Sequence, residues 1–316
     1  MPNKKILVIQ YSQSGQLNEV VQAFIGPLVT SSDIDVKIAT LVPEKAYPYP
    51  WPILSFFNVS PECIYQDPPR LKPLNLSQDE EFDLVILAYQ VWFLSPSLPT
   101  TAFLKSDEGK RLLHDKPVIT LIGCRNMWIM AQQAVSKLLT EMGARLIDNV
   151  VLVDQGSTLA SFITTPRWLL TGKKNAFWGF PEAGIAQAEI KASSRFGHAL
   201  ISALAQDQEQ QHAAMLSGLK AVNVDVGLVQ SEKAGYRSFL IWGKLLRKIG
   251  NQNNHLRKIV LVFYICFLIV LILTIVPLSM LLKSILQPLF KKKYQSIRQQ
   301  YELPSGSGNN RMKDFT

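Results

Sequence analysis

Short apolar runs alternate with helical patterns over the first 205 residues of the chain. The runs cover residues 4–11, 35–41, 82–89, 117–123 and 149–153, and the helical patterns cover 16–30, 99–113, 127–142 and 186–205. Repeated alternation of this kind is typical of a parallel sheet with helices on both faces. The 316 residues, 47% of them apolar, are enough for one such domain of roughly 200 residues plus an appendage.

Five strands in this arrangement predict an α/β, flavodoxin-like fold, which is a doubly wound five-stranded parallel sheet with the strand order 2-1-3-4-5. Ligands of such sheets bind beyond the carboxyl ends of the strands. Three loops are therefore expected to meet there. They are residues 12–17, 89–99 and 124–128.

The first of these loops has the composition of an anion-binding turn. Its residues are Ser12, Gln13, Ser14, Gly15, Gln16 and Leu17. A turn at this place offers backbone N–H groups, two hydroxyls and the positive end of a helix dipole to one point. It lacks the lysine that a nucleoside triphosphate loop requires, and it lacks the three glycines of the dinucleotide fingerprint. Hydroxyl donors without a cation suit a dianionic monophosphate such as that of FMN, although an ordinary turn with serine caps is the alternative.

The other two loops could enclose a flavin ring, which needs flat apolar walls and donors for its pyrimidine edge. Trp92 and Trp128 are candidate walls, and Gln90 and Asn126 could bond to the ring edge. Arg125 is the candidate catalytic residue, because a positive charge favours the anionic reduced flavin. For the tryptophans the alternative is core packing, and for Arg125 it is a surface ion pair. The remaining candidates for cofactor binding are Tyr89, Val91, Phe93, Cys124 and Met127.

Two irregular stretches, 43–76 and 157–181, are rich in proline or aromatic residues, and proline at the density of 43–76 argues against helix and central strand. A loop this long in a compact domain is usually functional. The aromatic side chains of 157–181 either line an apolar entrance to the site or cover the sheet. Three distant cysteines form no CxxC pair, so neither a metal site nor a disulfide framework is expected.

Residues 259–282 contain no charged side chain and exceed the length of about 20 residues that spans a bilayer, which predicts a C-terminal transmembrane helix. A bend at Pro277 that returns the chain to the same leaflet is the alternative. Basic residues are equally frequent on both flanks, so they do not fix the orientation. Because we found no signal peptide, we expect the soluble domain to face the cytoplasm.

Basic charge is concentrated around this segment. Residues 228–316 contain 14 lysines and arginines against 3 acidic residues, a net charge of +11, whereas residues 1–227 carry −2. Anionic lipid headgroups explain this placement better than nucleic acid does. We therefore expect a flavin domain over 1–206, a linker over 207–235, an amphipathic interfacial helix over 236–250, and a basic and then disordered tail over 283–316.

The chain resembles the dialkylresorcinol condensing enzymes, the flavodoxin-like partners of a ketosynthase. The matching segments are YSQSGQLNEVV, YPYPWP, AYQVWFLSPSLP, GCRNMW, DNVVLVDQGS, FITTPRWLLTGKKNAFWG and the apolar C-terminal segment. The resemblance implies FMN binding by Ser12 to Leu17, and less directly by Tyr89 to Phe93 and Cys124 to Trp128. It also implies oxidation of an alkylated cyclohexanedione to a resorcinol, so that the protein is an aromatase. The usual phosphate turn has two threonines, which Ser14 and Gln16 or Leu17 replace here.

These features favour a membrane-anchored FMN oxidoreductase that acts on a lipid-like cyclic dione. A membrane-bound electron-transfer flavodoxin and a non-catalytic scaffold for a ketosynthase are the alternatives. Partners could include a ketosynthase, an acyl carrier protein and a second copy of the chain. The electron acceptor is left open between NAD(P), a quinone and oxygen, and NAD(P)H could be a second cofactor beside FMN.

Overall fold

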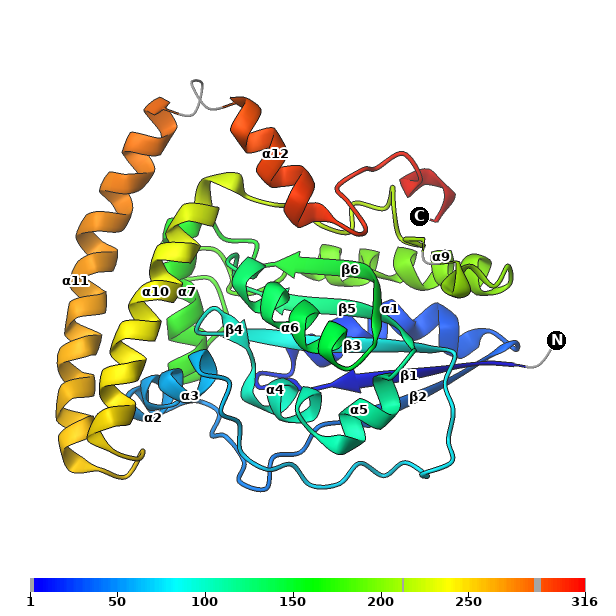
Figure 1. Ribbon diagram of the computed structural model, residues 1–316. Coiled ribbons are helices and arrows are strands. Elements are labelled where there is room, and N and C mark those ends of the chain that lie inside the picture. The colour runs from blue at the N-terminus through cyan, green and yellow to red at the C-terminus, as the bar shows by residue number, and fades with distance from the viewer. Residues whose placement is uncertain (1–2, 212, 287–290, 316) are drawn as a thin grey trace.

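A twisted parallel sheet forms the centre of the molecule (Figure 1). The computed structural model describes residues 3–211, 213–286 and 291–315. The five parallel strands are β1 (Lys4–Gln10), β2 (Ile34–Thr40), β3 (Leu84–Trp92), β5 (Pro117–Cys124) and β6 (Arg145–Val153). Their order is β2-β1-β3-β5-β6, and β4 (Ser95–Pro96) pairs antiparallel with the end of β3. This is the predicted strand order, and the fold is flavodoxin-like.

The strands form where the apolar runs predict them, because residues buried on both faces of a parallel sheet must be continuously apolar. Residues 6–9 of β1 and 84–89 of β3 are completely buried. Helices α1 (Gln16–Thr30), α8 (Gln187–Ala192) and α9 (Ser194–Leu204) pack together on one face. Helices α4 (Leu98–Leu104), α5 (Asp107–Leu113) and α6 (Ile129–Glu141) lie on the other (Figure 1).

Both irregular stretches contain helices, so the prediction of loops there is partly wrong. The first holds α2 (Ile53–Asn58) and α3 (Ser60–Ile64), and the second holds α7 (Thr158–Thr171). Proline is compatible with α2 and α3 because Pro52 and Pro61 stand at helix starts, where a missing N–H breaks no helical bond.

The predicted linker, 207–235, is also wrong. After η1 (Gln208–Gln210), residues from Met215 to Val224 run along β6, and the N–H of Val151 donates to the carbonyl of Ala221 (2.9 Å). Most of this segment is buried. Helix α10 (Val226–Ile249) then begins at an aspartate N-cap, Asp225. The segment therefore belongs to the domain.

The interfacial helix predicted over 236–250 is the second half of α10, and much of its apolar face contacts protein. The ring of Trp242 stacks on Tyr264 at 4.7 Å, Phe239 packs against Phe93 at 5.5 Å, and Leu246 is completely buried. This matches a helix packed on its own domain rather than one lying on the bilayer through that face.

Helix α11 (His255–Leu286) runs beside α10 and is continuous through Pro277, so the backbone shows no reversal there (Figure 1). Within it, His255–Thr274 is long and apolar enough to cross a membrane, by length and composition alone. Helix α12 (Lys291–Glu302) returns to the domain, and η3 (Met312–Asp314) ends the chain.

The predicted disordered tail is wrong for the described residues after α12, while residues 287–290 lie outside the described residues. The hydroxyl of Ser305 donates to Asp148 Oδ1 (2.7 Å) and accepts the N–H of Asn149 (2.7 Å). The N–H of Lys220 donates to the carbonyl of Gly308 (2.7 Å). The tail is thus fastened to the edge of the sheet at β6.

Candidate functional site

The turn between β1 and α1 presents free donors. Gly15 has a φ of +88°, a left-handed conformation that glycine adopts without strain, and its carbonyl accepts the N–H of Asn18 (3.0 Å). In the described part of the chain, the backbone N–H groups of residues 14–17 have no protein acceptor. The hydroxyl of Ser12 is buried and also lacks a partner. A buried unpartnered hydroxyl beside free N–H groups at a helix start is the donor set that a bound anion satisfies.

The three predicted loops converge at this end of the sheet. The side-chain oxygen of Gln90 accepts the N–H of Gln13 (2.9 Å), which joins the first loop to the second. A Cβ on Gly123 would lie 3.2 Å from Leu17 Cδ1, so the end of β5 approaches the first loop closely. The amide of Asn126 donates to Thr158 of α7 (3.4 Å). These contacts agree with the expected gathering of loops beyond the strand ends.

An aromatic cluster closes over the first two loops. Trp92 packs edge-on against Tyr11, Tyr47 and Trp51, with ring centroids 5.1–5.9 Å apart. The side chain of Gln13 donates to the carbonyl of Pro48 (2.7 Å) and accepts a hydrogen bond from the Tyr11 hydroxyl. The proline-rich segment therefore contributes Tyr47 and Trp51 to the site. Sequence reasoning singled out that segment but not these two residues.

Arg125 provides a positive charge beside the site. Its guanidinium lies 4.0 Å from the centre of the Phe162 ring, and among the described residues it has no acidic partner within ion-pair distance. Asp154, the nearby acid, instead accepts from the N–H groups of Gly156 (2.7 Å) and Gly184 (2.6 Å). Burial lowers the pKa of Arg125 to about 10, so the side chain stays charged at neutral pH.

The loop at residues 124–128 also contains Asn126, which could bind a ligand, and Cys124, which is unreactive. The side-chain oxygen of Asn126 is buried without a partner and could accept a donor from a bound group. Burial raises the pKa of the Cys124 thiol, which keeps it protonated and unreactive at neutral pH.

The side chains of several predicted site residues make contacts within the protein. The amide of Gln16 exchanges two hydrogen bonds with the backbone of Ile185 (3.0 and 3.2 Å), which secures the chain before α8. Tyr89 is fully buried, and its hydroxyl donates to Gln132 (2.6 Å). Trp128 belongs to the core, and Val91 pairs with Pro96 in the β3–β4 hairpin. Met127 is partly buried in the loop before α6.

Sequence reasoning missed Glu232, which α10 places against the third loop. Its carboxylate is 2% exposed and accepts the N–H of Met130 (2.7 Å) at the start of α6. Burial raises the pKa of Glu232 to about 7, so its charge changes near neutral pH. The only sequence signal was an isolated acid in a basic region, and its position depends on tertiary packing.

Similarity to known proteins is found among solved structures. No family model matches the sequence, and no curated protein matches it. Among solved structures, a flavoprotein in complex with FMN from Lactobacillus acidophilus has 16% identity, covers 47% of this chain and 93% of its own, and has a TM-score of 0.38. A flavodoxin from the domain Archaea has 11% identity over 65% of this chain and 99% of its own, with a TM-score of 0.36. A Trp repressor binding protein from Bacillus subtilis has 12% identity over 61% and 98%, with a TM-score of 0.30. At these TM-scores, the fold assignment rests on the strand order.

Proposed function

We propose that the protein is a membrane-associated, FMN-dependent oxidoreductase that aromatises a dialkylcyclohexanedione to a dialkylresorcinol. The observation that carries the flavin part is the turn at residues 12–17, where the buried hydroxyl of Ser12 and four backbone N–H groups lack protein partners. A phosphate dianion satisfies such donors at a helix N-terminus. The reaction and substrate are inferred from the sequence resemblance.

The residues around the turn fit FMN. Ser12, Ser14 and Gly15 would hold the phosphate, and Asn126 would bond to the edge of the ring system. Trp92, Tyr47 and Trp51 supply apolar surface beside the turn. Flavin, when bound, accepts a hydride equivalent from carbon.

The chain's own residues would assist by charge and by exclusion of water. Arg125 keeps a positive charge at the carboxyl end of the sheet, where negative charge gathers on an enolised dione or a reduced ring. The aromatic cluster around Trp92 keeps water from this edge. A 1,3-dione enolises easily, so the chemistry needs no strong base among these residues.

A continuous row of aromatic rings supports a lipid-like substrate. Phe56 lies 5.7 Å from Trp51 and 4.6 Å from Phe93, and Phe93 lies 5.5 Å from Phe239 on α10. Phe239 in turn lies 6.1 Å from Tyr264 on α11. Apolar side chains therefore link the candidate flavin site to the long apolar helix, and alkyl chains could be accommodated along them.

The proposed setting is the cytoplasmic face of a membrane, where a ketosynthase and its acyl carrier protein would deliver the dione. The test is conversion of a synthetic dialkylcyclohexane-1,3-dione by detergent-purified protein supplied with FMN, followed by mass spectrometry. Loss of two hydrogens per ring supports the proposal. FMN reduction by partner proteins without turnover of the dione would instead favour an electron carrier.

A further inference from the structure

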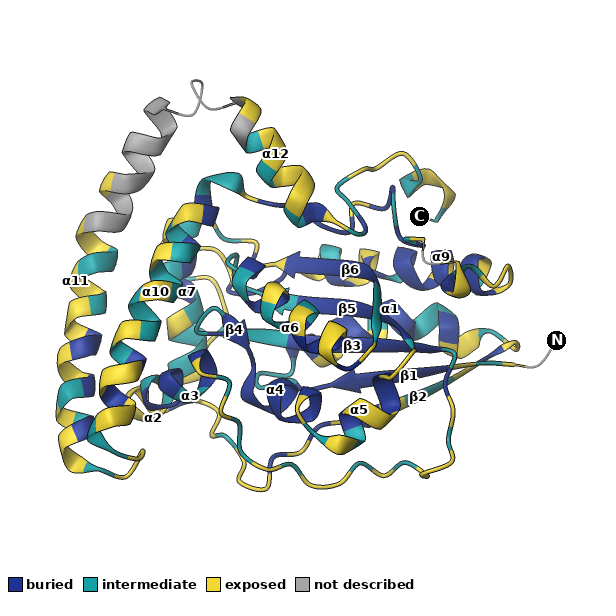
Figure 2. Cartoon of the chain, in the orientation of Figure 1, coloured by how far each residue is buried: buried dark blue, intermediate teal, exposed yellow. Residues whose placement is uncertain are grey.

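The outward face of α11 is a continuous apolar stripe. Its members recur every three or four residues and are exposed, up to 71% at Leu273 and 67% at Phe263. Figure 2 shows exposed residues along the side of α11 that faces away from α10. The stripe consists of Leu256, Ile259, Phe263, Val270 and Leu273, and Phe267 lies at its border, 43% exposed and 5.6 Å from the ring of Trp242 on α10. Water solvates such a surface poorly, so a partner is expected to cover it.

The opposite face of α11 is covered by protein. Leu261, Tyr264 and Ile265 are buried in a cluster with Leu246 of α10. The helix is therefore two-sided, with one face on the domain and one face free. A lone helix that crosses a bilayer contacts lipid on all sides, so this division indicates a different arrangement.

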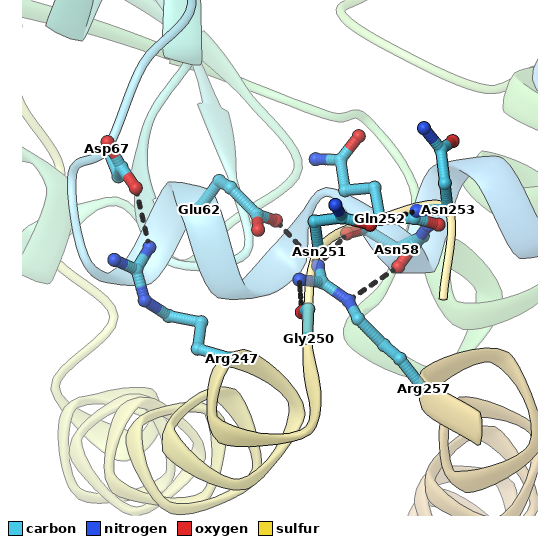
Figure 3. A network of polar contacts seen from close by, with 9 residues as sticks. All are labelled: Asn58, Glu62, Asp67, Arg247, Gly250, Asn251, Gln252, Asn253 and Arg257. Atoms are coloured by element: carbon cyan, nitrogen blue, oxygen red, sulfur yellow. Dashed lines mark hydrogen bonds and ion pairs between the residues drawn. The ribbon is translucent and has the colours of Figure 1, made fainter. Parts of the chain in front are cut away.

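The start of α11 is fastened to the domain by the buried side chain of Arg257 (Figure 3). Its Nε donates to Asn58 Oδ1 (2.9 Å), and its Nη2 donates to the carbonyl of Asn58 (2.8 Å) and to Glu62 Oε2 (2.9 Å). Its Nη1 donates to the carbonyl of Gly250 (3.1 Å). Arg257 is thus committed to protein partners and is not available to lipid headgroups.

The chain beyond α11 is fastened to the same domain. Lys233 of α10 lies 5.6 Å from the centre of the Tyr301 ring on α12. Ser305 bonds to Asp148 of β6, and Arg311 Nη1 donates to the carbonyls of Met215 (2.9 Å) and Ser217 (3.0 Å). Both flanks of α11 are therefore attached to one body.

This attachment bears on how the helix meets a membrane. The 32 residues of α11 make a rod about 48 Å long, which would carry a crossing chain through the whole bilayer. Helix α12, with the sequence KKKYQSIRQQYE, is too polar to cross back. A crossing would therefore separate the tail from Asp148 and break the contacts described above.

We propose that α11 does not cross the membrane but lies along one leaflet of an anionic bilayer, with its apolar stripe in the acyl region and both flanks on the same side. This inference rests on the membrane association in the proposed function. Exposed basic residues of the adjacent α10, Arg237, Lys244 and Lys248, match the anionic headgroups. A second copy of the chain would instead bring these like charges together, which disfavours dimerisation through the stripe.

Two variants test this topology, each with one introduced cysteine in a Cys266→Ala background. The cysteines that remain are shielded, since Cys63 is buried and Cys124 is partly buried and protonated. Asn309→Cys marks the tail and Ser32→Cys marks the domain, at exposed positions. Sealed inverted membrane vesicles from expressing cells are treated with an impermeant maleimide before and after detergent. Equal labelling of both variants before detergent supports the proposal. Labelling of only one until detergent is added would overturn it while leaving membrane association intact.

Vesicle binding tests the lipid partner and the membrane association on which both proposals depend. The triple variant with glutamine at Arg237, Lys244 and Lys248 should bind phosphatidylglycerol-containing vesicles about 100-fold more weakly than the unaltered protein, given about 1 kcal/mol per basic residue. The matched control carries glutamine at Lys110, Lys137 and Lys191, exposed on α5, α6 and α8, and should bind normally. If the unaltered protein does not bind these vesicles and forms a dimer once detergent is removed, both the membrane association in the proposed function and the proposed placement of α11 are overturned.

Discussion

Replacing Arg257 with glutamine should detach the start of α11 from the domain. The guanidinium is 1% exposed and makes four hydrogen bonds, one of them to the carboxylate of Glu62. Glutamine cannot reach all four acceptors, so Glu62 loses its cation and the buried oxygens of Asn58 lose their donors. Removing one partner of a buried ion pair costs about 3–5 kcal/mol of the free energy of unfolding.

Arg247 provides a matched control in the same region (Figure 3). It donates to Asp67 Oδ2 at 2.9 Å, the same distance as the bond from Arg257 to Glu62, but both side chains of this pair are more exposed, Arg247 at 35% and Asp67 at 61%. An exposed pair contributes about 0–1 kcal/mol, so Arg247→Gln should be almost neutral. The comparison keeps the residue type and the ion-pair distance constant, while burial and the number of hydrogen bonds that depend on the guanidinium differ.

The assay is urea unfolding in a fixed detergent, combined with amide hydrogen exchange. Arg257→Gln should lower the unfolding midpoint and speed exchange at residues 53–64 and 255–262, which face each other across the network. Arg247→Gln should change neither. Equal destabilisation by the two variants, or slow exchange in Arg257→Gln, would refute the reasoning that burial makes Arg257 the fastening point.

Three further predictions concern single groups. Ser12→Ala should weaken FMN binding about 10-fold or more, because it removes a hydrogen bond to a charged group. The apoprotein should stay at least as stable, because the hydroxyl has no protein partner. Titration calorimetry measures the FMN affinity, with Thr30→Ala as the control, and an unchanged affinity of Ser12→Ala would count against the prediction. Burial raises the pKa of Glu232 from 4.5 to about 7, so the stability that its neutral form contributes is present below pH 4.5 and is lost as the pH rises to 7, a decline of about 3 kcal/mol. Melting curves from pH 5 to 8 should show this decline relative to Glu232→Gln, and parallel profiles would contradict it. Ser305→Ala should lower the free energy of unfolding by about 1–3 kcal/mol, because Asp148 loses a buried hydrogen bond, and it should expose the tail to protease. An unchanged cleavage rate would show that other contacts hold the tail.

Local patterns predicted the sheet, because a parallel strand buried on both faces must be apolar throughout. The turn at Ser12 was predictable for a similar reason, since a strand, two serines and a glycine before a helix define donors within a few residues. The convergence of Gln13, Gln90 and Gly123 followed from the strand order, which places these loops at one edge.

Features that depend on distant contacts could not be predicted in this way. Residues 215–224 lack strong periodicity, and their burial results from pairing along β6. The polar tail is ordered by Ser305 and Arg311, whose acceptors lie far away in the sequence. Glu232 reaches the site only because α10 packs against the start of α6. In the sequence, Arg257 is one of the basic residues near the apolar segment that we assigned to lipid headgroups, because composition does not show whether a charge is buried.

A comparison of FMN with riboflavin tests most directly whether the turn at residues 12–17 binds a phosphate. The two ligands share the ring and the ribityl chain and differ in the phosphate alone. Quenching of flavin fluorescence by the purified protein should give one FMN per chain and a Kd about 100-fold lower for FMN than for riboflavin, since two charge-assisted hydrogen bonds contribute about 3 kcal/mol. Riboflavin binding as tightly as FMN, or no quenching of FMN at all, would contradict the assignment of the turn.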